Sequence, residues 1–402
     1  MHRDSERLWN SNYWKVMAAN FSMSFSFFLL TPLLPLYLKE NFGASKDVIG
    51  LVLSGYTIMA LLVRPFSGFL VDSFPRKKVL LLSLFLYFIC FGGYLLASTL
   101  LLFTIVRSVH GAPFGASTVA NSTMAIDVLP SSRRTEGIGY YGLSNNFATA
   151  IAPTVGMFIY RYVHNFDYLF ILAFAIAGFG FFIDATIKMP QRQTVPNKRA
   201  LSLDRFFLLK GWMIGLNIAF FGLCYGVLSN YLAIYGKERM NITSGTGTFF
   251  MLLSIGLILS RLQGGRMLRK GKLVHNAAEG VVISSVGYFL FVACPNMIGY
   301  YGAALLIGLG NGHLWPAFQN MIVAIAKNNE RGTANSTILT CWDLGLGIGI
   351  LFGGFFVEYG GYAMAFWWMA FMHIVGALLF FFVTIKAYRR KELENREPTQ
   401  NR

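Results

Sequence analysis

The chain has 402 residues, of which 55% are hydrophobic and only 13% charged, and its formal net charge is +16. A soluble domain carries about 25% charged residues. The apolar residues here come in runs of about 20 or more, long enough to cross some 30 Å of hydrocarbon as helices. This composition excludes an ordinary soluble domain and predicts a polytopic protein of the lipid bilayer. Nucleic acid is not an expected partner, because the bases lie between the apolar runs, where they set topology.

Apolar runs between charged or turn-forming clusters predict twelve transmembrane helices. The predicted limits are 14–38, 49–71, 79–97, 100–128, 138–161, 167–188, 209–235, 245–267, 273–293, 297–326, 332–357 and 362–387.

The longest polar interruption, residues 189–204, contains two prolines and several bases and divides the predicted helices six and six. We read it as a flexible linker between two bundles. The predicted organisation is an N-terminal six-helix bundle over 1–188, a cytoplasmic linker over 189–208, a C-terminal six-helix bundle over 209–388 and a charged cytoplasmic tail over 389–402. The fold class is therefore an all-α polytopic membrane protein with two pseudo-symmetric bundles.

The distribution of basic residues predicts the orientation. Most of them fall at the two termini and in every second turn, and the opposite side carries only Lys39, Lys46, Arg161, Lys237 and Arg239. Cytoplasmic loops carry the excess of Lys and Arg. Both termini are therefore expected in the cytoplasm, with the protein in the cell (inner) membrane.

The two halves contain related sequences. Arg64 and Gly68 recur at equal spacing as Arg261 and Gly265, and the turn at 132–137 is similar to the turn at 329–333. Two homologous six-helix halves are typical of transporters, whose binding site lies between the repeats near the bilayer midplane.

Four motifs resemble those of the major facilitator superfamily. The turn from Gly68 to Lys77 resembles its signature turn, Arg107 to Gly115 its fourth-span motif, Pro32 to Leu38 its first-span ending, and Gly142 to Gly156 its fifth-span antiporter motif. The last two are similar to those of the twelve-span drug:proton antiporter group. The resemblance implies a monomeric secondary transporter that works by alternating access. It would export small amphipathic molecules in exchange for protons, with no cofactor besides the proton gradient.

The resemblance also implies a gating latch formed by Gly68, Asp72, Arg76 and Asp127. Asp72 would meet the N-terminal end of the eleventh span, where a helix dipole favours an anion. Arg76 would reach Asp127, and Gly68 would allow close helix approach. The alternative is a solvated topology signal with no gating role.

Three residues are candidates for proton coupling. Asp343 lies about eleven residues into its span, or ~16 Å deep, where burial of a carboxyl favours its protonated form. The alternative is a fixed ion pair or hydrogen bond. His110 titrates near neutral pH, although it could equally be a packing residue. The resemblance implies that Arg107 influences proton transfer or binds an anionic group. Its alternative is a side chain that snorkels to the interface.

Embedded polar and aromatic residues of spans 1, 5, 7 and 10 are candidates for a substrate cavity, and the resemblance places spans 1, 4, 7 and 10 around the central path. The candidates are Asn20, Ser24, Asn145, Asn146, Asn217, Tyr225, His313, Trp315 and Gln319. The alternative for each is an interhelical hydrogen bond, worth ~0.6 kcal/mol on average. Asp184 and Glu279 lie near cytoplasmic span ends and are expected at the membrane interface.

Other functions remain as alternatives. Ala152 stands where the fifth-span motif usually has glycine, which leaves open a proton-coupled importer, or an exporter of one metabolite such as a sugar or a siderophore-like molecule. An embedded enzyme is a remote alternative, because the spans show no H-E-x-x-H and no nucleophile with a base and an acid. No catalytic residue and no metal site are therefore predicted. A non-transporting receptor would be expected to carry a large soluble loop.

Overall fold

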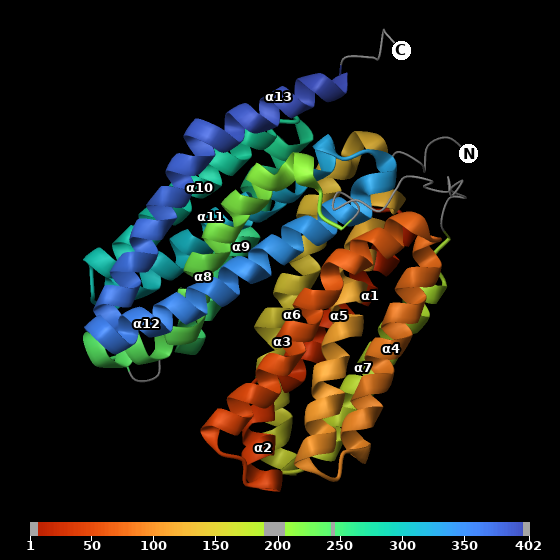
Figure 1. The fold of residues 1–402 in the computed structure, drawn as a ribbon, viewed down its shortest axis with the longest axis vertical. Helices are drawn as coiled ribbons and strands as arrows, with labels where there is room; N and C mark the ends of the chain where they lie inside the picture. The colour runs from red at the N-terminus through yellow and green to blue at the C-terminus, as the bar shows by residue number, and fades with distance from the viewer. Residues whose placement is uncertain (1–6, 189–205, 243–245, 397–402) are drawn as a thin grey trace. The chain divides into compact units, whose positions relative to one another are not determined.

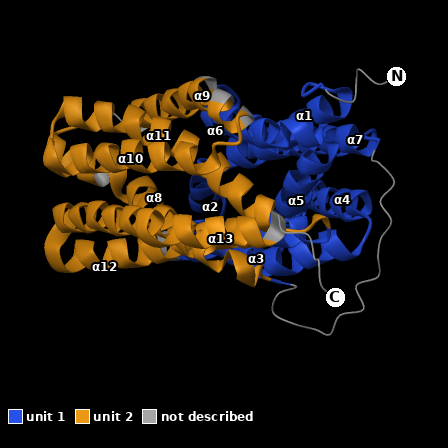
Figure 2. Ribbon diagram, turned by 90° about the horizontal axis from the view of Figure 1, so that it is seen from above, with its two compact units in different colours: residues 1–206, 329–336 blue, residues 207–328, 337–402 orange. Residues whose placement is uncertain are grey.

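A computed structural model describes residues 7–188, 206–242 and 246–396, and every regular element in these ranges is a helix (Figure 1). The chain separates into two compact units (Figure 2). Unit 1 contains residues 1–206 and 329–336, and unit 2 contains residues 207–328 and 337–402. Residues 329–336, which the sequence analysis assigns to the C-terminal bundle, thus group with unit 1. Most of the predicted linker, 189–205, lies outside the described residues.

Unit 1 is built from seven helices. They are α1 (Ser11–Leu30), α2 (Leu34–Phe42), α3 (Lys46–Ser73), α4 (Arg76–Leu96), α5 (Leu100–Val128), α6 (Arg134–Val163) and α7 (Phe166–Ala185). The axes of α1 and α2 differ by 43°, so the pair forms one broken span, and a proline occupies the start of α2. Helix α1 packs on α6 and α7, α3 packs on α5, and α4 packs on α5 and α7.

Unit 2 contains α8 (Trp212–Met240), α9 (Thr246–Arg269), α10 (Leu273–Ala293), α11 (Met297–Ile325), α12 (Arg331–Leu379) from residue 337 onward, and α13 (Ile385–Arg396). A π-helix at Phe380–Thr384 precedes α13. Helix α11 packs on both α9 and α10. Gly361, with φ 76° and ψ 175°, interrupts α12. This break falls between the predicted spans 332–357 and 362–387. A glycine occupies the position because a positive φ is unfavourable for residues that carry a Cβ.

Each of the twelve predicted spans overlaps a helix among the described residues. Seven stretches are long and apolar enough to cross a membrane, and the bent pair α1–α2 is an eighth. One of the seven, Asn328–Glu394, contains the two spans on either side of Gly361. Helices α5, α6 and α11 fall outside this criterion, and each buries polar residues, for example Asn121, Ser144 and Asn320. Buried polar positions of this kind are where membrane proteins place functional groups.

Side-chain caps fix several of the short turns. Thr99 Oγ1 accepts a hydrogen bond from the N–H of Leu102 at 3.2 Å, at the start of α5. Asn296 Oδ1 accepts one from the N–H of Gly299 at 2.9 Å, at the start of α11. Such caps satisfy backbone N–H groups that have no partner within the helix. The turns near 98 and 295 can therefore be very short.

Glycines allow α8 and α12 to pack backbone against backbone within unit 2. A Cβ on Gly222 or Gly226 of α8 would overlap a carbonyl oxygen of α12. A Cβ on Gly345 or Gly349 of α12 would overlap a carbonyl oxygen of α8. Small residues spaced four apart are the usual means of close helix approach in membranes.

Candidate functional site

The turn between α3 and α4 brings three of the four latch residues together in unit 1. Asp72 lies in the last turn of α3, and Arg76 is the first residue of α4 after the N-cap Pro75. Arg76 Nη2 donates to Asp72 Oδ1 at 3.1 Å, and Arg76 Nη1 donates to Asp127 Oδ2 at the end of α5. The side chains of Arg76 and Asp72 are only 3% and 8% exposed, so this ion pair is shielded from water.

Asp72 also binds the first turn of α12, which belongs to unit 1. Its Oδ1 accepts from the N–H of Gly332 at 2.9 Å. Its Oδ2 accepts from the N–H and the Oγ1 of Thr333 at 2.8 and 3.0 Å. These N–H groups lack intrahelical partners, and the helix dipole adds to the attraction for an anion. The carboxylate therefore acts as a cap for α12 supplied by a different helix.

Asp127 also binds a second cation, which was not predicted from the sequence. Arg331 Nη1 donates to Asp127 Oδ1 at 3.2 Å, so the carboxylate is held between Arg331 and Arg76. Arg331 begins α12, where a cation is unfavourable to the dipole unless an acid compensates it. A basic residue at the start of a predicted helix therefore indicates a nearby acidic partner, and this pattern could have identified Arg331 from the sequence.

Gly68 makes the approach of α12 possible. A Cβ at this position would lie 2.7 Å from Ser336 Cβ and 2.9 Å from the carbonyl oxygen of Gly332. Nearby, Asn335 Nδ2 donates to Thr123 Oγ1 of α5 at 3.1 Å. A side chain larger than hydrogen at position 68 would therefore separate α3 from the start of α12.

Arg107 and His110 lie in an aromatic cluster inside unit 1. The hydroxyl of Tyr94 is 3.2 Å from Arg107 Nη1 and 2.8 Å from His110 Nδ1, so it bridges the two. The Arg107 guanidinium carbon lies 4.0 Å from the ring centroid of Tyr56. Arg107 forms no ion pair with any described residue, and a cation–π contact therefore supports its buried charge. Tyr56 and Tyr94 were not predicted, since aromatic residues are too frequent here to stand out.

Asp343 lies half-buried on α12 beside a group of aromatic rings in unit 2. The neighbouring Trp342 meets Trp315 of α11 edge to face, with centroids 5.2 Å apart, and Tyr225 of α8 at 5.7 Å. The two predicted cavity residues Tyr225 and Trp315 are thus brought together by a third ring. All three rings are half-buried.

Other cavity candidates take part in interhelical hydrogen bonds. Asn20 Nδ2 donates to Ser144 at 2.7 Å, Asn217 Nδ2 donates to the carbonyl of Gly376 at 2.8 Å, and His313 Nδ1 lies 2.9 Å from Asn276 Oδ1. The remaining candidates are Ser24 and Gln319, which are buried, Asn146, which is half-buried, and Asn145, which is exposed.

Asp184 lies next to the last residue of α7, near a span end as expected. The sequence did not predict its burial: the residue is 0% exposed, where α7 packs on α1 and α4. Glu279 is half-buried. The burial of Asp184 was not predicted, because closeness to a span end says nothing about which face of the helix the side chain occupies.

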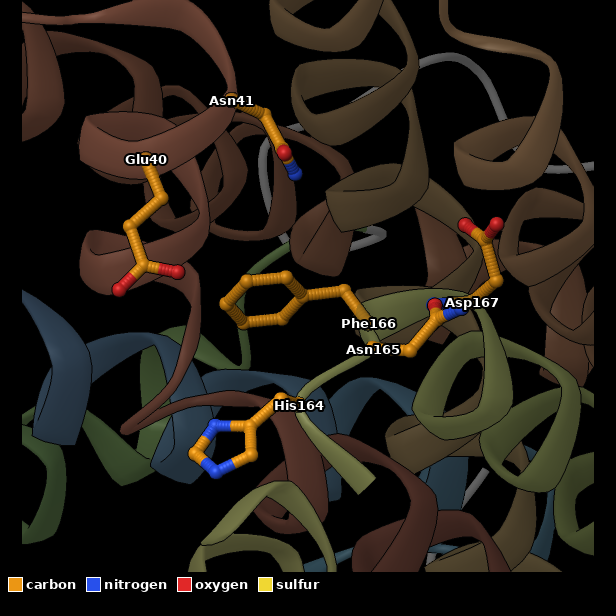
Figure 3. Close-up of a pocket in the computed structure, with 6 residues that line it drawn as sticks. All are labelled: Glu40, Asn41, His164, Asn165, Phe166 and Asp167. Atoms are coloured by element: carbon orange, nitrogen blue, oxygen red, sulfur yellow. The ribbon is translucent and has the colours of Figure 1, made fainter. Parts of the chain in front are cut away.

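A small pocket lies between the end of α2 and the turn that joins α6 to α7 (Figure 3). It has a volume of about 260 Å³ and is lined by Glu40, Asn41, His164, Asn165, Phe166 and Asp167. Close to it, the Tyr160 hydroxyl donates to Glu40 Oε2 at 2.5 Å. Across the described ranges, no group of three or more His, Cys, Asp or Glu residues is arranged to hold a metal ion.

The helical architecture and the exposed apolar side chains define a multi-pass membrane protein. Leu62, Phe179 and Leu351 are 57%, 62% and 74% exposed, as expected of faces turned toward lipid. Residues 16–298 and 277–401 match the sequence profile of the Major Facilitator Superfamily. The chain therefore belongs to this superfamily and is a transporter of that kind.

The chain is similar to two named transport proteins at low sequence identity. The chain is 22% identical over 323 residues to the staphylopine export protein of Staphylococcus aureus, covering 77% of this chain and 80% of that protein. It is 21% identical over 338 residues to the quinolone resistance protein NorA of the same species, covering 81% and 84%.

Solved structures share the fold. The transporter FucP in its outward conformation has a TM-score of 0.79 at 16% identity, covering 93% of this chain and 99% of FucP. The human organic anion transporter MFSD10 has a TM-score of 0.78 at 16% identity, covering 92% and 98%.

Proposed function

We propose that this transporter exports small amphipathic molecules in exchange for protons, by alternating access, from the inner membrane with both termini in the cytoplasm. The names of the two sequence relatives, an export protein and a resistance protein, support transport out of the cell. The half-buried aromatic group of Tyr225, Trp315 and Trp342 would suit a substrate with apolar surface. The working protein is a monomer and uses no cofactor besides the proton gradient.

The single observation that carries the gating part of the proposal is the capping of α12 by Asp72. A carboxylate that accepts three hydrogen bonds from the first turn of another helix is a strong contact that one small displacement breaks. In the proposed cycle the latch closes the cytoplasmic side, and its release opens that side to substrate.

In the same proposal, protons act through Asp343 in unit 2 and through the pair of Arg107 and His110 in unit 1. Asp343 is half-buried, so a modest movement changes its contact with water. Moving a carboxyl between wet and dry surroundings changes its affinity for a proton. Arg107 adjusts the proton affinity of His110 through the Tyr94 hydroxyl that bridges them.

The test is transport in inside-out membrane vesicles with an imposed pH gradient. Accumulation of an amphipathic dye in acidified vesicles, abolished by an uncoupler, is the expected result. Accumulation that needs the reverse gradient would identify an importer. Accumulation that ignores the gradient would refute proton coupling.

A further inference from the structure

The C-terminal end of α7 buries an acidic group that none of the roles above uses. Asp184 is 0% exposed, and neither of its carboxylate oxygens has a hydrogen-bond partner among the described residues. A carboxylate removed from water and given no donors is strongly unfavourable in its charged form. The neutral acid, in contrast, needs only modest compensation.

The cation that acts on Asp184 forms its hydrogen bonds with other groups. Lys77, in the first turn of α4, is the cation whose field acts on Asp184. Its Nζ donates instead to the carbonyl oxygens of Ala185 and Ile187, at 2.7 and 2.8 Å. Cations commonly stabilise helix C-termini in this way. Asp184 forms no ion pair with a described residue, so the cation and the acid are close but not joined.

Ionisable side chains of two other helices that pack on α7 also donate to acceptors other than Asp184. From α1, the Lys15 amine donates to a carbonyl just beyond α7 at 3.2 Å, and the Tyr13 hydroxyl donates to the carbonyl of Gly137 at 2.6 Å. From α6, the Tyr141 hydroxyl donates to a side-chain oxygen of α1 at 2.8 Å. Lys77, Lys15, Tyr13 and Tyr141 thus each donate to an acceptor other than Asp184.

We propose that Asp184 is a proton-binding site and that Lys77 is its switch. With the proton bound, Lys77 caps α7. When the proton leaves to water, the Lys77 amine gives up its two carbonyl hydrogen bonds and pairs with the new carboxylate. Arg76 of the latch precedes Lys77 directly, so this movement reaches the ion pairs with Asp72 and Asp127.

The proposal deepens the proposed proton coupling, but its test needs no transport. Infrared difference spectra of the purified, full-length protein would be recorded across a pH series. The expected result is a component of the protonated-carboxyl band that is present at neutral pH, disappears at alkaline pH and is lost in Asp184→Asn, whereas the contribution of Asp343 remains. Asp167→Asn is the matched control, because Asp167 is exposed in the first turn of the same helix. A spectrum of Asp184→Asn that keeps the full band intensity of the unmodified protein at neutral pH, or the lack of any such band in the unmodified protein, overturns the proposal.

A second variant keeps the test valid if Asp184→Asn does not fold. Lys77→Gln retains the acid and removes the cation that would attract its charged form. Its carboxyl band should persist to a pH about 1–3 units higher than in the unmodified protein. An unchanged or lowered midpoint would refute the switch. If the midpoint shifts as expected but vesicle transport is indifferent to pH, the site stands and the proposed coupling fails.

Discussion

The substitution Asp72→Asn tests the latch most directly. The carboxylate accepts from the N–H groups of Gly332 and Thr333, from the Thr333 hydroxyl, and from Arg76. Asparagine has nearly the same shape but only one accepting oxygen. Its NH₂ group would face donors instead of accepting from them. The change therefore removes charge and acceptors without creating a cavity.

The size of the effect follows from these contacts. Hydrogen bonds to a charged group contribute about 1.5–3 kcal/mol each. The variant loses one or two of them and keeps the rest as weaker neutral bonds, so we expect a cost of about 2–4 kcal/mol. Since 1.4 kcal/mol is tenfold, the equilibrium between latched and released forms should shift by roughly 30- to 700-fold toward release.

The assay is cysteine labelling from the cytoplasmic side. A cysteine-free background with the single substitution Asn121→Cys places a thiol on the buried face of α5, where Asn121 is 0% exposed. Asp72→Asn should raise its rate of reaction with a membrane-impermeant maleimide in inside-out vesicles. Glu358→Gln, at an exposed acid, is the control. If Asp72→Asn labels no faster than this control, the gating role of the latch is refuted.

Three further outcomes are expected. Asp343→Asn should abolish the dependence of vesicle transport on the pH gradient, and full gradient-driven transport in this variant would exclude Asp343 as the proton carrier. Arg107→Lys keeps the charge but loses the planar group that lies over an aromatic ring, so transport should fall about tenfold, whereas the exposed Arg161→Lys should have no effect. Gly345→Val should lower the free energy of unfolding by about 1–3 kcal/mol, while Gly347→Val, which has open space at its Cβ, should not, and equal melting temperatures would contradict the packing argument.

The number and approximate limits of the helices were predictable because long apolar runs in a sequence indicate membrane-spanning helices. The break at Gly361 falls between two predicted spans, since a charged and glycine-rich turn interrupts the apolar run there. The grouping of 329–336 with unit 1 was not predictable as a domain assignment. It depends on which helix caps the first turn of α12, and that is a contact between residues 260 positions apart.

The candidate site was predictable where charge is concentrated in sequence. Asp72 and Arg76 stand four residues apart in one turn, and this spacing is enough to bring them into contact. Arg331 was missed because its partner lies 204 positions away. The burial of Asp184 was missed for a related reason. Helix α7 is apolar on nearly all sides, so its sequence does not show which side faces protein and which faces lipid.

The reciprocal glycines of α8 and α12 have a mechanical consequence. Because each helix presents its glycines to the carbonyl groups of the other, a slip of one residue in either direction would drive a side chain into a backbone. We therefore expect α8 and α12 to keep one packing register and to move as one rigid pair. On this basis, Tyr225 on α8 and Asp343 on α12 should shift together. A displacement of one helix along its axis would carry the other helix with it.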